Sequence, residues 1–146
     1  MTDASESHYR KLERMYLGAP VNEYFRPTIR ISEGEAEVRI PVRTEFFHAA
    51  HAVHGSVYFK ALDDATFFAA NSLVTDVFVL TASFNLYLLR PISEGTLVAR
   101  GRVVNRSKRV IIAEGVVVDD RDREIARGSG SFLPSGIQLT ADIGFR

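Results

Sequence analysis

Residues 55–73 constrain the fold more than any other part of the chain, because their apolar side chains fall on every side of a helical wheel. The charged residues Lys60, Asp63 and Asp64 are the interruptions in this segment. A helix that is apolar on all sides must be covered on most of them by other elements. The sequence therefore predicts a long, buried helix that the rest of the chain surrounds.

Strand-like runs lie on both sides of this helix in the sequence. Residues 35–42 alternate apolar and charged side chains, which is typical of a half-buried strand. Four runs rich in Val, Ile, Phe and Thr, separated by turn-forming residues, come after the helix at 77–90, 96–105, 110–118 and 124–133. Near the N-terminus, the helical spacing of apolar residues over 5–17 predicts a short amphipathic helix, capped by Ser5 or Ser7 and ended by Gly18. This order predicts an α+β fold in which a mostly antiparallel sheet packs against the central helix.

Length and composition fit a single domain over residues 1–146. Hydrophobic residues make up 46% of the chain and charged residues 25%, which is enough to build a core. Lysine plus arginine and aspartate plus glutamate each number 18, so a uniformly basic nucleic-acid binder is not expected. The first residues lack the apolar core of a signal peptide. No stretch of the sequence reaches the roughly 18 uninterrupted apolar residues that a membrane span needs. We expect a cytoplasmic protein without a membrane partner, frayed from residue 135 onward.

Several common chemistries lack their residues in this sequence. There is no cysteine, which excludes disulfides, thiolate metal sites and cysteine nucleophiles. The serine-hydrolase elbow, the zincin motif and the P-loop are also missing. Gly128 and Gly130 lie in the last strand-like run, without the following helix that a dinucleotide site requires. They indicate instead a close backbone approach or a bulge.

Three histidines, His48, His51 and His54, precede the start of the buried helix at Gly55 and Ser56. The free backbone N–H groups at a helix N-terminus can polarise a carbonyl or hold an oxyanion, and each such donor contributes about 2.7–4 kcal/mol in a working site. Histidines at every third position could also converge on zinc, but no acidic ligands stand nearby. The fourth histidine, His8, is expected on the surface of the first helix.

Asp63 and Asp64 lie in the middle of the otherwise apolar helix. A carboxylate there is costly unless it is used or paired, and burial should raise its pKa, which would make it a better base near neutral pH. The alternative is a structural role, in bonds to neighbouring strands or in an ion pair with Lys60 or Arg90. Because adjacent helical residues point about 100° apart, the two aspartates cannot share one role.

The stretch His54-Gly55-Ser56, with Asp63 nine residues after His54 and with Thr81 and the run from Asn85 to Gly95 beyond, resembles the PaaI-like acyl-CoA thioesterases of the hotdog fold. The resemblance covers about residues 12–133. It implies a long central helix wrapped by an antiparallel sheet of five or more strands. It also implies that His54 and Gly55 form the turn that opens this helix, that Asp63 is the base or nucleophile, and that Thr81 helps to position water.

Three positions depart from the family pattern. Ser56 replaces the second glycine of the turn, His48 stands where asparagine is common, and His51 stands where glycine is usual. His48 can still donate or accept a hydrogen bond to the attacking water.

The resemblance also implies a coenzyme A substrate and a homo-oligomer, either a dimer or a dimer of dimers. Asp63 and Thr81 of one subunit would then meet His54 and Gly55 of its partner, and the apolar run 77–89 would be covered beyond its own subunit. No metal and no cofactor is implied beyond the coenzyme A of the substrate. The residues assigned to substrate binding are Ser56, Arg90, Arg106, Ser107, Lys108 and Arg109. The cations among them suit phosphate, although a basic turn can also be a solvated hairpin tip.

The leading hypothesis is thus hydrolysis of a small, medium-chain or aryl acyl-CoA. Gly55 would polarise the thioester carbonyl, Asp63 would activate water or attack directly, and His48 and Thr81 would orient the water. One alternative is a non-catalytic protein that binds or senses acyl-CoA on the same fold. Another is a hydratase or dehydratase, although these enzymes typically space their Asp and His differently. Five phenylalanines could line an acyl pocket, but most are expected in the core: Phe46, Phe47, Phe59, Phe67 and Phe68.

Overall fold

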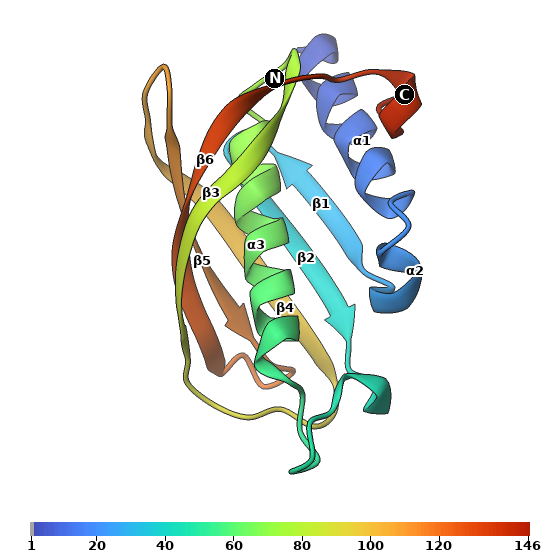
Figure 1. Cartoon of the computed structure of the whole chain (residues 1–146), viewed down its shortest axis with the longest axis vertical. Helices are drawn as coiled ribbons and strands as arrows, with labels where there is room; N and C mark the ends of the chain where they lie inside the picture. Colours follow the sequence, from blue (N-terminus) through green and yellow to red (C-terminus); the bar gives the residue numbers. More distant parts are fainter. Residues whose placement is uncertain (1) are drawn as a thin grey trace.

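The computed structural model describes residues 2–146, in which a six-stranded antiparallel sheet wraps around the central helix α3 (Figure 1). The strand order is β1-β2-β4-β5-β6-β3. This arrangement confirms the α+β prediction and the long central helix. The elements are α1 (Asp3–Leu17), α2 (Asn22–Phe25), β1 (Thr28–Ser32), β2 (Glu35–Pro41), α3 (Gly55–Asn71), β3 (Val77–Leu88), β4 (Thr96–Arg106), β5 (Ile111–Val118) and β6 (Glu124–Gln138), with 3-10 turns at Thr44–Phe46 and Ala141–Ile143.

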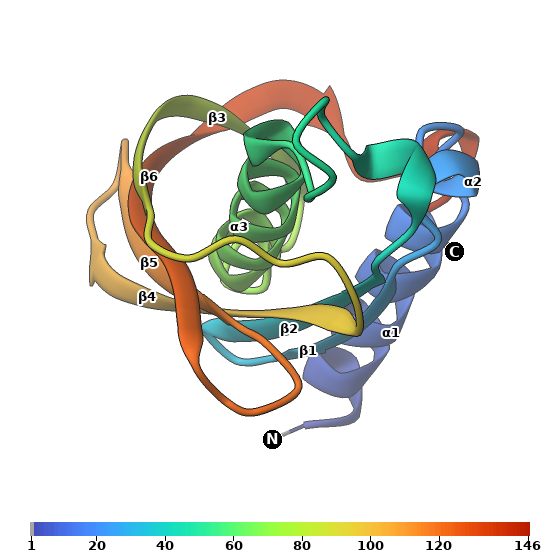
Figure 2. The same cartoon turned by 90° about the horizontal axis from the view of Figure 1, so that it is seen from below.

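Glycines let the sheet approach α3 closely. Gly101 on β4 pairs with Gly115 on β5, and an added Cβ at Gly101 would lie 2.6 Å from the backbone carbonyl of Ala65. At Gly115 the added Cβ would lie 3.1 Å from the Thr66 side chain. The α3 turn that follows Asp63 therefore rests almost directly on the strands. Figure 2 shows the sheet curling around the helix from β1 to β3.

The two glycines of β6 leave room for a side chain of the neighbouring strand β3. The ring of Phe84 on β3 would lie within 2.8 Å of a Cβ added at Gly128 and 2.5 Å from one at Gly130. β3 pairs with β6 rather than with β4, its successor in the chain, so it forms one edge of the sheet.

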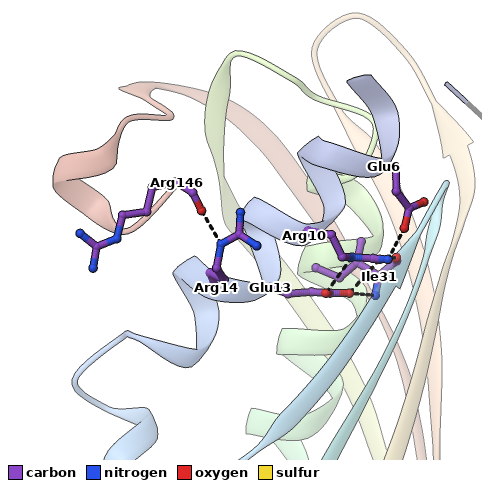
Figure 3. A network of polar contacts seen from close by, with 6 residues as sticks. All are labelled: Glu6, Arg10, Glu13, Arg14, Ile31 and Arg146. Carbon is purple, nitrogen blue, oxygen red and sulfur yellow. Dashed lines mark hydrogen bonds and ion pairs between the residues drawn. The ribbon is translucent and has the colours of Figure 1, made fainter. Parts of the chain in front are cut away.

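Helix α1 covers the open side of the sheet and is tied to β1. The Arg10 guanidinium lies between Glu6 and Glu13 and donates to the carbonyl of Ile31, while Glu13 accepts the Ile31 N–H at 2.8 Å (Figure 3). Near the other end of α1, Arg14 donates to the carbonyl of Arg146. These bonds hold both β1 and the chain's last residue against the helix.

The two ends of the chain and two short elements differ from the sequence predictions. The cap of α1 is Thr2, whose hydroxyl accepts the N–H of Ser5 at 3.1 Å, so the helix begins before the predicted caps. Strand β1 and helix α2 were not predicted. The chain beyond residue 135 is not frayed, because β6 continues to Gln138 and Phe145 packs on the core.

The prediction that His8 lies on the surface is wrong. Its side chain is buried, its Nε2 lies 3.0 Å from the Asn71 carbonyl at the end of α3, and its ring packs edge-on against Phe145. The helical spacing placed His8 beside Tyr9 and Leu12, but it gave no sign that the C-terminal segment covers this side of α1. Within residues 2–146, no helix has the length and apolar character needed to cross a membrane.

Candidate active site

Asp63 is half-buried near the middle of α3 and faces β3. Its Oδ1 accepts a hydrogen bond from the Thr81 hydroxyl at 2.8 Å. Burial raises the pKa of Asp63 above its ordinary value, while the bond from Thr81 opposes that rise. The predicted direction of the pKa shift is therefore confirmed.

Asp64 points away from Asp63 and is paired, as the 100° angle between neighbours requires. Its Oδ2 lies 2.7 Å from the Lys60 ammonium and accepts the Tyr16 hydroxyl at 2.6 Å. Burial raises the pKa of Asp64, and Lys60 opposes this effect. The ion pair is thus formed by Asp64 with Lys60, and of the two adjacent aspartates Asp63 is the one without an ion pair among residues 2–146.

Aromatic rings flank Asp63 at the neighbouring turns of α3. Phe59 packs edge-on against Phe84 of β3 with ring centroids 5.4 Å apart, and Phe67 packs against Phe78 at 5.0 Å. Phe67, like Phe46 and Phe68, is buried in the core, whereas Phe59 is 37% exposed. Phe84 was not singled out in the sequence, because its contact with Phe59 depends on the position of β3.

The N-terminus of α3 is capped by the side chain of His54. Its Nδ1 accepts the Ser56 N–H at 3.0 Å and lies 2.8 Å from the Ser56 hydroxyl. Within residues 2–146, the N–H of Gly55 makes no hydrogen bond to protein. This N–H is therefore free at the positive end of the helix dipole, where it can donate to a ligand oxygen.

Hydrogen bonds within the loop before α3 fix its conformation. His48 Nδ1 accepts the Ala50 N–H at 3.1 Å, and the His48 carbonyl accepts the His51 N–H at 3.1 Å. His51 has a φ of 64°, in the left-handed region that favours glycine. The three histidines thus serve different local bonds and do not form a metal-ligand cluster, nor do any other three such side chains within residues 2–146.

A pocket of about 390 Å³ opens beside the helix N-terminus. Tyr58 in its wall donates a hydrogen bond from its hydroxyl to the Arg90 carbonyl at 2.8 Å. The lining residues are His48, Val53, His54, Gly55, Tyr58, Leu88, Leu89, Arg90 and Pro91. The structure therefore brings together His48, His54, Gly55 and Arg90 from the predicted set.

The structure does not bring Gly55 and Asp63 together within one chain. They lie eight residues apart on the same helix, which corresponds to about 12 Å along its axis. Edge strand β3 beside them carries exposed apolar side chains, including Leu80 at 47% and Leu88 at 54%.

The basic turn lies at the opposite end of the molecule from His54. Residues 106–109 are exposed at the tip between β4 and β5, and Arg106 donates to the Leu73 carbonyl, just beyond the end of α3 (Figure 1). The Ser107 hydroxyl is used locally, since it exchanges hydrogen bonds with the backbone of Val110.

A larger hollow, of about 820 Å³, lies on the face of the sheet that points away from α3. Two of its arginines are paired: Arg100 with Glu37 at 3.2 Å and Arg102 with Glu114 at 2.6 Å. The sheet separates this hollow from α3 and from the helix N-terminus, so the smaller pocket is the better candidate for chemistry.

Comparisons with known sequences agree with this geometry. A model of the thioesterase superfamily matches residues 50–126, more than half of the chain. A Saccharolobus solfataricus protein provisionally named an esterase is 25% identical over 130 residues, which cover 88% of this chain and 89% of that protein. A Thermoplasma acidophilum protein with the same kind of name is 24% identical over 106 residues, covering 70% and 77%.

Solved structures share the fold. The E. coli PaaI protein of the phenylacetic acid degradation operon matches with a TM-score of 0.85 and 21% identity, covering 94% of this chain and 100% of that one. A Ralstonia eutropha protein, described as related to phenylacetic acid degradation, matches with a TM-score of 0.76 and 23% identity, covering 86% and 98%. The chain therefore has the hotdog fold and belongs to the thioesterase superfamily, a membership that supports hydrolase activity.

Proposed function

We propose that the protein hydrolyses acyl-CoA thioesters with Asp63 as the reacting carboxylate. The observation that carries this proposal is the Asp63 side chain itself: half-buried, without a cation partner among the described residues, and bonded to the Thr81 hydroxyl at 2.8 Å. A carboxylate held in this way is a better proton acceptor than one in water. The acyl group is of the small, medium-chain or aryl class.

The Gly55 N–H supplies the second half of the chemistry. It donates to the thioester carbonyl oxygen and stabilises the negative charge that develops there. Asp63 takes a proton from water as the water oxygen bonds to the carbonyl carbon, or bonds to that carbon directly. The carbon–sulfur bond then breaks, and coenzyme A leaves as a thiolate that takes up a proton. When water is the nucleophile, the free acid is the other product. When Asp63 attacks directly, a mixed anhydride between the acyl group and Asp63 remains, and water hydrolyses it to the free acid and the regenerated carboxylate.

His48 and Thr81 orient the water in this mechanism. Because His48 Nδ1 accepts the Ala50 N–H, the ring proton is on Nε2, which leaves a donor for the pocket. The Thr81 hydroxyl donates to Asp63 and can accept from the same water. Thus His48 can replace the amide donor that the family commonly has at this position.

Two subunits are needed to complete this site. Asp63 and Gly55 of one chain are too far apart to act on one carbonyl, and β3 is an apolar edge strand that a second copy can extend. In the proposed homodimer, Asp63 and Thr81 of one subunit face the helix N-terminus of the partner. A dimer of dimers is compatible with this arrangement.

The basic residues are assigned to the phosphates of coenzyme A. Lys108 and Arg109 are exposed at the β4–β5 turn with Arg106, and the pairing of two subunits would bring this end of one chain toward the helix N-terminus of the other. Arg90 and Ser56 line or border the pocket where the pantetheine arm would enter. Neutralising Arg106, Lys108 and Arg109 together should raise KM more than it lowers kcat.

Thiol release from a panel of short, medium, long-chain and aryl acyl-CoAs tests the proposal. The intact protein should turn over part of the panel, and Asp63→Asn should lose at least about a hundredfold in kcat, because the base is gone while size and shape remain. Circular dichroism and gel filtration check that the variant keeps its fold and oligomer. Undiminished turnover in a folded Asp63→Asn protein would refute the assignment.

Gly55→Pro tests the helix N-terminus separately. Proline removes this N–H, is favoured at the first helical position, and tolerates the extended backbone of His54, whose φ is −63° and ψ is 143°. We expect kcat to fall by about 10²–10³. Gly55→Ala is the matched control, since it keeps the N–H but adds the same Cβ beside Leu88.

The second candidate function is binding of acyl-CoA without hydrolysis. Ser56 favours it, because its hydroxyl and N–H both bond to His54 Nδ1 where the family usually has glycine. Calorimetric binding of acyl-CoA without thiol release would establish this function. Hydration of an enoyl-CoA would instead indicate the hydratase alternative.

A further inference from the structure

Three polar side chains that the mechanism above does not use lie directly beside Asp63. Asp64 and Lys60 belong to α3, and Tyr16 reaches them from α1. The side chains of Lys60 and Asp64 are only 15% and 14% exposed, and Tyr16 is 4% exposed. A largely buried ion pair repays its desolvation only when its geometry is well satisfied.

Both polar partners of Asp64 bind the same carboxylate oxygen. Asp64 Oδ2 receives both the Lys60 ammonium at 2.7 Å and the Tyr16 hydroxyl at 2.6 Å. The ammonium also lies 5.2 Å from the ring centroid of Tyr16 and 5.1 Å from that of Phe25, within the range of cation–π attraction. Helix α1 and the segment of α2 therefore enclose this cluster against the same turn of α3 that carries Asp63.

We propose that Lys60, Asp64 and Tyr16 are positioning residues for the reaction at Asp63, anchoring its turn of α3 to α1 and setting the charge that it experiences. This inference rests on the proposed function. Since neighbouring side chains on a helix diverge by about 100°, holding Asp64 toward α1 turns Asp63 toward β3 and Thr81. The N-terminal helix thus contributes to the site without touching it.

The charges act on Asp63 in opposite directions. After burial and the Thr81 bond, Asp64 raises the pKa of Asp63, and Lys60 lowers it by a smaller amount. Tyr16 is the titratable group that faces the cluster from α1, whereas β3 contributes the Thr81 hydroxyl and α2 the Phe25 ring. No charged side chain of the strands is among the groups that shift either carboxyl. In the proposed dimer His54 of the partner approaches as well, and it is common to all the variants below.

The test is the pH dependence of kcat/KM for an acyl-CoA that the intact protein hydrolyses. Activity rises with pH as the base ionises, so the acid limb of the profile follows Asp63. Asp64→Asn removes the repelling charge and leaves Lys60 uncompensated, and both changes should move this limb to lower pH. In Lys60→Met/Asp64→Asn the limb should lie between those of Asp64→Asn and the intact protein, because the cation is also gone.

A merely structural role would lower the melting temperature of these variants without displacing the limb. An unmoved limb in active Asp64→Asn would therefore overturn the inference, and the double variant serves if Asp64→Asn does not fold. Tyr16→Phe changes no charge, so the acid limb of its pH profile should not move, while kcat should fall several-fold. An unchanged kcat in this variant would overturn the role of Tyr16. Asp63→Asn distinguishes failure of the proposed function from failure of this inference. If it remains active the proposed function fails, whereas its inactivity with unmoved limbs in the other variants rejects this inference alone.

Discussion

Asp63 is costly for the fold for the same physical reason that suits it to the chemistry. Burial removes water from the carboxylate and raises its pKa, and the single bond from Thr81 offsets only part of this loss. The ionised form that the proposed mechanism requires is therefore the form that the folded state disfavours. Stability and activity oppose each other at this residue.

Replacing Asp63 with asparagine should consequently stabilise the protein near pH 7. The pKa of Asp63 lies above 3.8 in the folded state, so ionisation destabilises wild type at neutral pH, and this penalty disappears as pH falls through the folded pKa toward 3.8. The melting temperature of Asp63→Asn should exceed that of wild type at pH 7, and the difference should shrink on acidification. Asp76→Asn, at an exposed position, is the control. A lower melting temperature for Asp63→Asn at pH 7 would contradict this account.

His51 carries strain of a different kind. Its φ of 64° lies in a region that costs a residue with a Cβ about 1–2 kcal/mol, and its side chain is exposed. We expect His51→Gly to raise the free energy of unfolding by about 0.5–1 kcal/mol. Glycine relieves the strain at positive φ, but its greater conformational entropy in the unfolded chain offsets part of that stabilisation. His51→Ala keeps the strain and should show no gain in a denaturant titration.

At this scale the sequence predicted what depends on neighbours along one helix. The divergence of Asp63 and Asp64 and the raised pKa of Asp63 followed from spacing and burial. Lys60 was one of two possible partners for an aspartate, with Arg90, and the structure selects Lys60 for Asp64. The contact with Thr81 came only through the family resemblance, because the sequence contains no information on the register of β3 against α3. His8 was misplaced for a similar reason, since the segment that covers it is 137 residues further along the chain.

Among the elements, α3 packs closely on the strands behind it because glycine on those strands has no side chain to separate the two backbones. Gly101 faces the α3 backbone so closely that a methyl group would lie 2.6 Å from the carbonyl of Ala65, and a helix backbone cannot move aside as a side chain can. The position of Asp63 along the sheet thus depends on this contact.

Gly101→Ala should therefore destabilise the protein by about 1–3 kcal/mol or more, the usual result of overpacking. It should also lower kcat, because the helix that carries Asp63 must shift away from β4. Gly136→Ala is the matched control on β6, where an added Cβ meets nothing within 4 Å. Equal melting temperatures for the two variants would show that the sheet adjusts without cost.

The helices and strands were largely predictable from the sequence, whereas the pairing of the strands was not. The helix at 55–73 and the four later strands have strong apolar patterns, and the structure places them within a few residues of the predicted limits. Strand β1 has five residues and pairs with β2 through a turn at Gly34, which has a φ of 69°, so its pattern was too short to detect. The pairing of β3 with β6 is a long-range contact that no local pattern encodes.

For the whole molecule, the separation of Asp63 from Gly55 is the decisive fact. In the proposed mechanism Asp63 accepts a proton and Gly55 binds the carbonyl oxygen, but the two residues lie about 12 Å apart on one helix. In the proposed homodimer a two-fold axis would form two complete sites. An isologous interface would place Asp63 of each subunit opposite Gly55 of the other. The exposed apolar side chains of edge strand β3 favour such an interface.

Mixed dimers test this arrangement. Asp63→Asn and Gly55→Pro, each inactive alone, are unfolded together in equal amounts and refolded. Random pairing makes half of the dimers mixed, and each mixed dimer has one site with both changes and one with neither, so activity should return to about a quarter of wild type. Native mass spectrometry confirms that mixed dimers form, and wild type refolded in the same way sets the reference. If mixed dimers form and stay inactive, Asp63 and Gly55 do not act together across the interface, because a shared site between subunits must regenerate one intact copy.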